Sequence, residues 1–445
     1  MHDGHSSRPG TSRRAFLSAG AASLFGFNLA PSLLAGHIGS ANSTPVIRND
    51  LSVIIVWLKG GLSTIDTFDM KPDAPSEIRG EFQPISTSAP GIQICEHLPR
   101  IAGQMDKISL IRSFGHRNSS HEEANHYMLT GYHPLAGFNK SLSPNNQRPA
   151  HGAVISKKLG SRGAVPAYVC VPRMAASAGS SFLGPAAAPF TIESNPAAPD
   201  FSVPDVVPPS GLSSRRAAGR NVLLARVDRF NGSLITTSNA RAQAVSQFRE
   251  SAFSLMTSAT AKEAFELRSE SESLRDSYGR HTLGQSCLLA RRLVEGGVRC
   301  VHIDALDWDT HDKNFVLLRK ELLPMLDSAV SSLYRDLHDR GLLEKTMVVV
   351  AGEFGRTPRI NSRAGRDHWG PSFTVAIGGG GIKGGRIVGA SDAHAERPAT
   401  SPHGPEDLAA TIFSRMGINP DDEFLTPEGR PVKIANDGHT IHDLL

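Results

Sequence analysis

An uninterrupted apolar run at residues 52–58, Ser-Val-Ile-Ile-Val-Trp-Leu, limits most strongly what this chain can fold into. Its β-branched side chains do not alternate with polar ones, which is typical of a strand buried on both faces of a parallel sheet. Similar runs at 108–113, 298–303, 346–351 and 372–377 are separated by helical patterns at 122–129, 283–294 and 315–340. This alternation predicts an α/β fold: a doubly wound, largely parallel sheet with helices on both faces.

The first 41 residues have the pattern of an export signal. Arg13 and Arg14 precede Ala-Phe-Leu, an uncharged stretch follows to residue 35, and Gly39-Ser40-Ala41 offers a cleavage site of small residues. Adjacent arginines in this position resemble a twin-arginine signal, which exports folded proteins. We therefore expect residues 1–41 to be removed and the mature protein to be periplasmic or secreted.

The remaining chain is predicted to form one domain over residues 45–445. A proline-rich and then helical stretch at about 185–277 indicates an insertion. No internal window reaches the roughly 18 uncharged apolar residues of a membrane span. A balance of 47 basic against 43 acidic residues argues against nucleic acid as a partner. Because no CxxC pair occurs, Cys287 and Cys300 are expected to be small core residues rather than disulfide or zinc-ribbon partners.

Polar side chains follow the predicted strands. Asp309 and His311 come after residues 298–303, and Glu353 and Arg356 come after residues 346–351, with His368 a little further on. Ligands of open α/β sheets bind at the carboxyl ends of the strands. Carboxylates and imidazoles together suit a divalent metal, so these acids and histidines are the predicted ligands, with Asp307 an alternative to Asp309. Arg356 is either an anion clamp or the partner of a neighbouring carboxylate.

Four motifs at residues 60–72, 308–311, 352–358 and 365–369 occur in an order that is similar to one bacterial family. That uncharacterised family of twin-arginine-exported proteins is placed in the alkaline phosphatase–sulfatase superfamily. The resemblance covers roughly residues 45–445 and implies an alkaline-phosphatase-like core. It does not imply a substrate.

The resemblance also implies which metal ligands are kept and which are lost. An acid and a histidine in one loop with a distant histidine, the superfamily's first metal site, correspond to Asp309 (or Asp307), His311 and His368. At the second site, Gly60-Gly61 occupies the place of an acid after the first strand, and Phe354, next to Glu353, occupies that of a histidine. We expect one metal, zinc, with calcium or manganese as alternatives, unless Asp66 or Asp69 replaces the missing ligand.

The nucleophile position is changed as well. Sulfatases carry a Cys or Ser nine residues before the Thr of a Leu-Thr-Gly-x-x-Pro segment, which is present at residues 129–134. Counting back from Thr130 gives His121, preceded by Ser120. His121 is a candidate nucleophile, proton carrier or metal ligand, or it only lines a polar pocket. The predicted catalytic residues are therefore His121, Ser120 and Arg356.

Together these features predict an exported, metal-dependent hydrolase of phosphate or sulfate esters, on a small molecule or a polysaccharide. The alternative is a non-catalytic binding or scaffold protein that keeps the fold with a degraded metal site.

Overall fold

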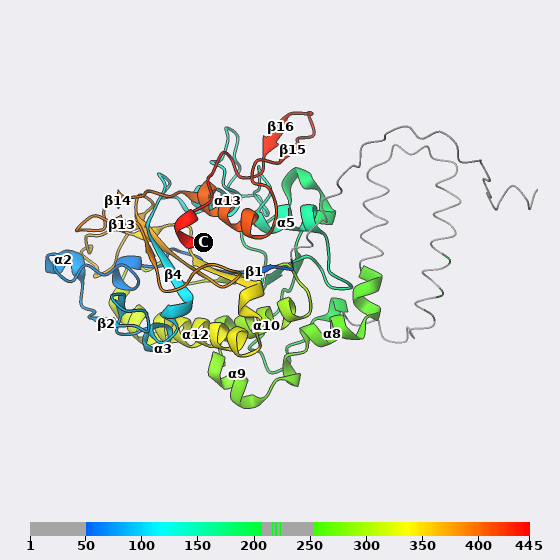
Figure 1. Cartoon of the computed structure of the whole chain (residues 1–445), viewed down its shortest axis with the longest axis horizontal. Helices are drawn as coiled ribbons and strands as arrows, with labels where there is room; N and C mark the ends of the chain where they lie inside the picture. The colour runs from blue at the N-terminus through cyan, green and yellow to red at the C-terminus, as the bar shows by residue number, and fades with distance from the viewer. Residues whose placement is uncertain (1–49, 207–215, 217–218, 220–222, 224–251) are drawn as a thin grey trace, which may run out of the picture. The chain divides into compact units, whose positions relative to one another are not determined.

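The computed structural model describes residues 50–206, 216, 219, 223 and 252–445 (Figure 1). The predicted signal segment and part of the predicted insertion at 185–277 lie outside these residues. All elements below belong to the unit that begins at Asn49.

An eight-stranded sheet forms the centre of this unit, in the order β12-β4-β11-β8-β1-β7-β5-β6. β1 is buried at every position and pairs in parallel with β7 on one side and β8 on the other. Because Trp57 of β1 lies opposite both Asp304 and Ala351, the three strands end at the same edge. The strands are β1 (Ser52–Leu58), β4 (Ile108–Phe114), β5 (Tyr168–Val171), β6 (Phe190–Thr191), β7 (Cys300–Ala305), β8 (Thr346–Ala351), β11 (Phe373–Gly378) and β12 (Ile387–Val388).

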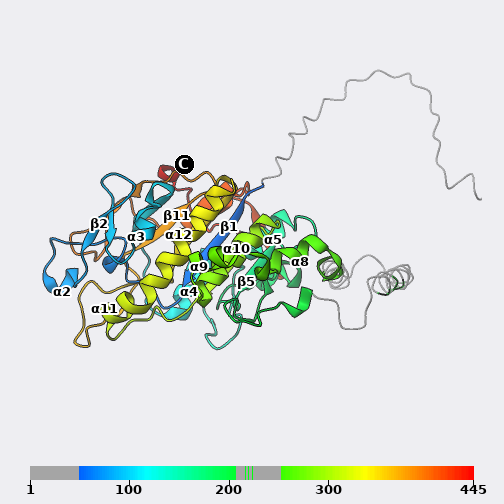
Figure 2. The same cartoon turned by 90° about the horizontal axis from the view of Figure 1, so that it is seen from below.

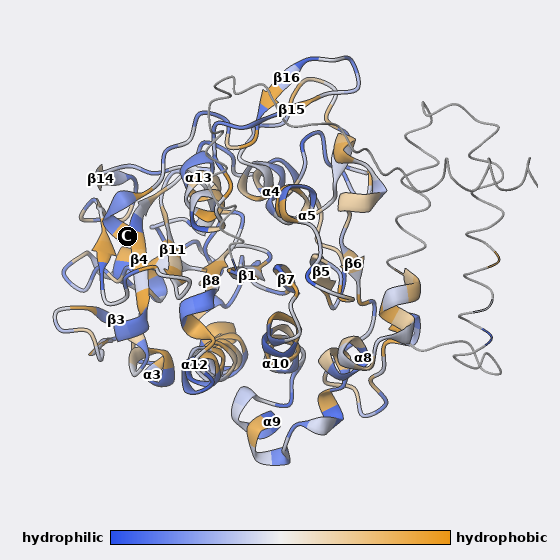
Figure 3. Ribbon diagram, turned by 45° about the vertical axis from the view of Figure 1, so that its right-hand side comes forward, coloured by the Kyte–Doolittle hydropathy of each residue, from blue (hydrophilic) through white to orange (hydrophobic). Residues whose placement is uncertain are grey.

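Helices cover both faces of this sheet, as Figure 3 shows on either side of the row of strands. One face packs against α10 (Thr282–Glu295) and α12 (Leu323–Asp339), which lie side by side in Figure 2, with α3 (Pro99–Ala102), α8 (Ala259–Phe265) and α9 (Glu272–Tyr278) beyond them. The opposite face packs against α4 (His121–Thr130), α5 (His151–Leu159) and α13 (Pro405–Arg415). Alternate residues of β1 enter the two cores, Ile54 and Val56 in one and Val53 and Ile55 in the other.

The predicted fold class is confirmed: the sheet is mixed but mostly parallel, with helices on both faces. Its exception is β11, which runs antiparallel to both neighbours, β4 and β8. Residues that precede β11 therefore reach the edge at which β8 ends. That reversal brings the hairpin of β9 (Gly355–Arg356) and β10 (His368–Trp369) to the carboxyl ends of β1, β7 and β8.

The other predicted elements also differ from the observed ones only locally. The helix expected at 315–340 is divided into α11 (Asn314–Leu317), a π-helical turn at Leu318–Leu322, and α12. All four cysteines are buried and free, which confirms the core placement expected for Cys287 and Cys300. Within the described residues, none of the helices has the length and apolar character that a membrane crossing requires. The remaining regular elements are α2 (Ser76–Arg79), β2 (Pro84–Ser86), β3 (Gln93–Cys95), β13 (Ala390–Ser391), β14 (Pro398–Thr400), β15 (Glu423–Leu425) and β16 (Pro431–Lys433).

Candidate metal centre

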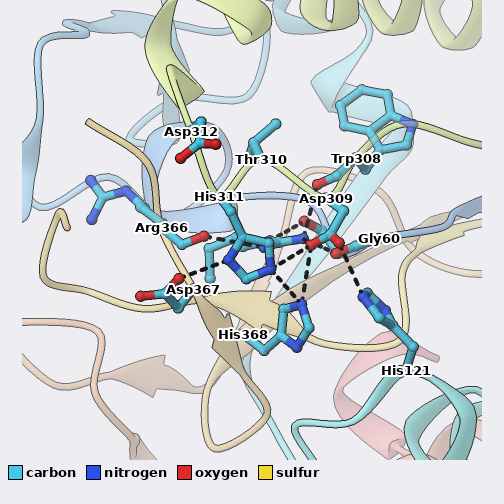
Figure 4. Close-up of polar contacts among 12 residues, drawn as sticks. Gly60, His121, Trp308, Asp309, Thr310, His311, Asp312, Arg366, Asp367 and His368 are labelled. Carbon is cyan, nitrogen blue, oxygen red and sulfur yellow. Dashed lines mark hydrogen bonds and ion pairs between the residues drawn. The ribbon is translucent and has the colours of Figure 1, made fainter. Parts of the chain in front are cut away.

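Four segments bring the predicted site residues together at this edge (Figure 4). Asp309 and His311 lie in the loop after β7, and Glu353 follows β8 directly. His121 is the first residue of α4, and His368 begins β10. The segments are far apart in sequence, since His121 and Asp309 are separated by 188 positions.

Three electron-rich atoms converge at the centre of the site. Nε2 of His311 lies 2.9 Å from Nε2 of His368 and 3.0 Å from Oδ1 of Asp309. Oδ1 of Asp309 lies 3.1 Å from Nε2 of His368 and closes the triangle. In a tetrahedral zinc site with ligands at 2.0–2.1 Å, donor atoms are separated by roughly 3.3 Å. The triangle therefore has nearly the size of one face of such a site.

The outer nitrogens of the two histidines define which ring atoms face the centre. Nδ1 of His311 lies 2.7 Å from Oδ1 of Asp367, and Nδ1 of His368 lies 2.9 Å from the carbonyl oxygen of Ser119. A carboxylate and a carbonyl can only accept, so both Nδ1 atoms donate. In the neutral rings, each Nε2 then presents a lone pair to the other and to the carboxylate. Such an arrangement requires a cation, either a proton or a metal ion, and outer-sphere partners of this kind are typical of metal-ligating histidines.

His121 lies between two carboxylates. Its Nδ1 lies 2.6 Å from Oε1 of Glu353 and its Nε2 lies 3.3 Å from Oδ2 of Asp309. Burial of the ring favours the neutral form, but the hydrogen bonds to both carboxylates outweigh it and raise the pKa of His121 to about 9. The imidazolium thus carries a proton on each nitrogen at neutral pH. His121 also forms, with Asp309 and His368, a group whose ligand atoms lie within 4.8 Å of one another.

Glu353 contacts His121 and not the three atoms of the triangle. It is completely buried, and Oε1 accepts the backbone N–H of Gly60 at 2.9 Å as well as the His121 proton. Its Oε2 has no hydrogen-bond partner among the described residues. Its observed contacts make Glu353 the carboxylate that orients His121.

Arg356 is an ion-pair partner of Asp309. Its side chain is shielded from solvent, and its guanidinium donates to the carbonyls of Gly60, Gly61, Trp308 and Arg366 and to Oδ1 of Asp309. Of the two interpretations open from the sequence, this geometry favours the ion pair over the exposed anion clamp. Although burial favours the neutral acid, the hydrogen bond from His121 and the charge of Arg356 hold the pKa of Asp309 well below its usual range.

Gly60 and Gly61, where the resemblance implies that an acid of a second metal site is lost, have no room for a side chain. Gly60 has a φ of +114°, and a β-carbon there would lie 2.4 Å from the backbone nitrogen of Asp309. A β-carbon on Gly61 would lie 2.7 Å from the ring of Phe354. Phe354 in turn packs against the rings of His121 and His368, with centroids 5.0 and 4.5 Å away. The ring of Phe354 thus provides apolar packing beside these two histidines.

The suggested substitute ligands lie elsewhere. Asp66 is fully buried and forms a bidentate ion pair with Arg366, with both N–O distances at 2.7 Å. Asp69 contacts Lys71, Arg112 and Ser391. The expectation that either might replace the missing ligand is therefore wrong, because their oxygens are engaged in structural pairs. Asp309, and not Asp307, has carboxylate oxygens within 3.3 Å of His121, His311 and His368, so Asp309 is the acid that joins the histidines.

Ser120 stands apart from the other predicted catalytic residues. It is the N-cap of α4, and its Oγ contacts Oε2 of Glu122 at 3.4 Å and Nζ of Lys140 at 3.3 Å. No histidine of the described residues is hydrogen-bonded to that hydroxyl. Sequence reasoning gave no role to Asp367 or Ser119, although the adjacency of Asp367 and His368 was a signal that could have suggested one.

The fold and the site define an α/β protein with a candidate divalent-metal centre at the carboxyl edge of its sheet. The chain belongs to the family described as "Protein of unknown function (DUF1501)", which matches residues 50–445. Comparison with curated proteins finds no match.

Several solved structures are distantly similar. The PsFucS1 sulfatase from Pseudoalteromonas sp. is 12% identical with a TM-score of 0.37, covering 83% of this chain and 68% of that one. For the phosphonate monoester hydrolase SpPMH from Silicibacter pomeroyi, the identity is 13%, the TM-score 0.39 and the coverage 89% and 76%. The lipoteichoic acid synthase LtaP from Listeria monocytogenes is 10% identical with a TM-score of 0.36, covering 87% of this chain and 76% of that one.

Proposed function

We propose that this chain is a metal-dependent hydrolase of phosphate or sulfate esters that holds one divalent cation on Asp309, His311 and His368. The observation that carries the proposal is the triangle of Asp309 Oδ1 and two Nε2 atoms, with both Nδ1 atoms committed to acceptors. Two imidazoles and one carboxylate favour zinc over calcium or manganese, which prefer oxygen ligands. Zinc is therefore the proposed ion.

A divalent cation at this position supplies Lewis acidity toward an ester oxygen. The chain's own residues supply the rest. Arg356 holds Asp309 in its ionised form and fixes its orientation. His121, protonated between Glu353 and Asp309, is placed to give a proton to a leaving oxygen, after which the neutral ring can take one from a nucleophile. Ser120, the neighbouring residue, is a second candidate for attack on the ester.

The proposed substrates are anionic esters of a small molecule or a polysaccharide. The motif resemblance to the alkaline phosphatase–sulfatase superfamily supports the ester class, and the arginine pair at residues 13 and 14 supports export to the periplasm or beyond. Removal of residues 1–41 belongs to the same proposal.

A non-catalytic binding or scaffold protein is the second candidate. Phe354 and the two closed glycine positions favour it, because they leave the site without a second cation to stabilise attacking and leaving oxygens together. Such a protein need not hold stoichiometric metal, which makes metal content the discriminating measurement.

The test combines elemental analysis of the exported protein with a panel of phosphate and sulfate esters. We expect one zinc per chain and turnover of at least one ester class. His311→Ala should lose both the zinc and the activity, whereas His121→Ala should lose the activity and keep the zinc. A protein without stoichiometric metal would overturn the hydrolase in favour of the scaffold, and two metal ions per chain would overturn the one-metal site.

A further inference from the structure

Two cationic side chains, those of Lys59 and Arg173, follow strands that end at the edge of the sheet carrying the candidate metal centre. Neither forms an ion pair with Asp309 or Glu353. Lys59 is the residue after β1, and Arg173 follows β5 by two positions. Between them in the sheet is β7, whose Asp304 lies opposite Trp57 of β1. Since β1, β7 and β5 are neighbours in parallel pairing, the three residues lie side by side at the edge that carries Asp309 and Glu353.

Asp304 is a buried carboxylate with unusual surroundings. Its side chain is 1% exposed, and neither oxygen has a hydrogen-bond partner among the described residues. Its one ionic contact among the described residues is with Nε of Arg173, at 3.3 Å. Burial raises the pKa of Asp304 to about 6, against which the charges of Lys59 and Arg173 act. Asp304 thus pairs with Arg173 through Nε alone.

The donors of the two cations remain available. Within the described part of the chain, the Lys59 ammonium forms no hydrogen bond or ion pair, and only Nε of Arg173 is engaged. The Arg173 side chain is 51% exposed, and Lys59 is half-buried. Backbone continuity places Lys59 next to Gly60, whose N–H contacts Glu353. The charges of Lys59, Arg173 and Glu353 all act on Asp304, so the two cations and the carboxylate that orients His121 lie around one residue of β7.

Arg356 does not bind the anion of a substrate. Its guanidinium is buried and engaged by carbonyls and Asp309, so it offers no surface to an anion. We propose, resting on the ester hydrolase proposed above, that Lys59 and Arg173 form the oxyanion-binding subsite of this centre and select esters by their sulfate or phosphate charge. An ammonium and the free end of a guanidinium suit a tetrahedral oxyanion, and Asp304 keeps the pair's net charge at +1 rather than +2.

Inorganic sulfate and inorganic phosphate are the probes. Each is titrated calorimetrically at low ionic strength into the full-length mature protein, once freed of metal by a chelator and once loaded with zinc. The test variants are Lys59→Met, Arg173→Met and the double variant, which keep the apolar stems and remove the charges. Lys320→Met, on the π-helical turn before α12, is the control because Lys320 is exposed on the other side of the sheet.

We expect the parent protein and Lys320→Met to bind at least one probe, and the double variant to bind it at least about tenfold more weakly, with zinc content unchanged. Arg173→Lys should retain part of the affinity, which separates loss of charge from misfolding. Equal affinity in parent and double variant, or no binding of either anion by the parent, would overturn the subsite. A parent protein that binds no zinc would instead overturn the proposed hydrolase. The anion titration of the metal-free protein would still decide whether Lys59 and Arg173 form the subsite.

Discussion

His311 and Asp367 form a close pair in which the carboxylate oxygen lies 2.7 Å from Nδ1 of the ring. Because Asp367 can only accept there, it fixes the tautomer of His311 and turns Nε2 toward Asp309 and His368. The hydrogen bond from His311 lowers the pKa of Asp367 below its ordinary value. Asp367, which is not one of the proposed ligands, thus leaves the lone pair of His311 Nε2 available to a cation.

Asp367→Asn should weaken zinc binding about 10- to 100-fold, because the amide no longer specifies which ring nitrogen carries the proton. Competition with a chromogenic chelator measures the affinity. Asp312→Asn is the matched control, since Asp312 lies in the same loop but pairs with Arg363. Equal affinities for the two variants would contradict the role assigned to Asp367.

His121 should make the metal-free protein sensitive to alkali. The pKa of His121 is raised from 6.5 to about 9 in the folded state, so its stabilising contribution is complete below about pH 6.5 and is lost as the pH rises through 9. Because the ring is partly exposed, we expect a loss on the order of 1 kcal/mol between these limits. Denaturant unfolding at several pH values checks this, and His121→Gln should lack that part of the pH dependence.

The buried pair of Asp66 and Arg366 should matter for stability and not for metal content. Removing one member with Arg366→Met leaves a carboxylate without its ionic partner in the core, which costs about 3–5 kcal/mol. The exposed pair of Arg319 and Glu81 is the control, and Arg319→Met should cost less than about 1 kcal/mol. Loss of zinc from still-folded Arg366→Met would contradict the purely structural role assigned to this pair.

Gly60→Asp, which restores an acid after the first strand, should not create a second metal site. A β-carbon would meet the backbone nitrogen of Asp309 at 2.4 Å, so the loop that carries Asp309 and His311 must shift. We expect weaker binding of the first zinc. Gly91→Asp is the control, because Gly91 also has a positive φ, +82°, but open space around it. A Gly60→Asp protein with two metal ions per chain would refute this account.

Replacement of both Arg13 and Arg14 by lysine should leave the protein in the cytoplasm. A lysine pair keeps the positive charge, so the variant tests for the twin arginines rather than for a basic tail. Fractionation and N-terminal sequencing provide the measurement, with cleavage after residue 41 expected for the parent. Normal export of the lysine variant would end the twin-arginine hypothesis.

The apolar runs predicted the central strands well because burial on both faces leaves an unmistakable sequence. Residues 52–58 and 346–351 have the predicted bounds, and the strand expected at 298–303 begins two residues later, at Cys300. Direction was harder to predict. Nothing in the composition of residues 373–378 distinguishes an antiparallel strand from a parallel one, although its direction decides how His368 reaches the site.

The site was predictable in residue type and less so in detail. Asp309, His311 and His368 were found because they follow strands in a recognisable order. The role of Arg356 stayed open between two interpretations and that of Asp66 was not foreseen, since their partners Asp309 and Arg366 are 47 and 300 positions away. Which acceptor a guanidinium or a carboxylate finds at such a separation depends on tertiary packing, which periodicity does not report.

The antiparallel course of β11 has a consequence for the order of assembly. His368 contacts the Ser119 carbonyl 249 positions away. This contact lies in the segment that precedes β11, the strand between β4 and β8. The triangle of Asp309 Oδ1 and the two Nε2 atoms therefore exists only after strands from both halves of the chain have joined, and a nascent or partly folded chain presents separate ligand atoms. Uptake of the ion proposed above would therefore follow completion of the sheet, and the compartment in which the protein finishes folding would decide which metal is available to the site.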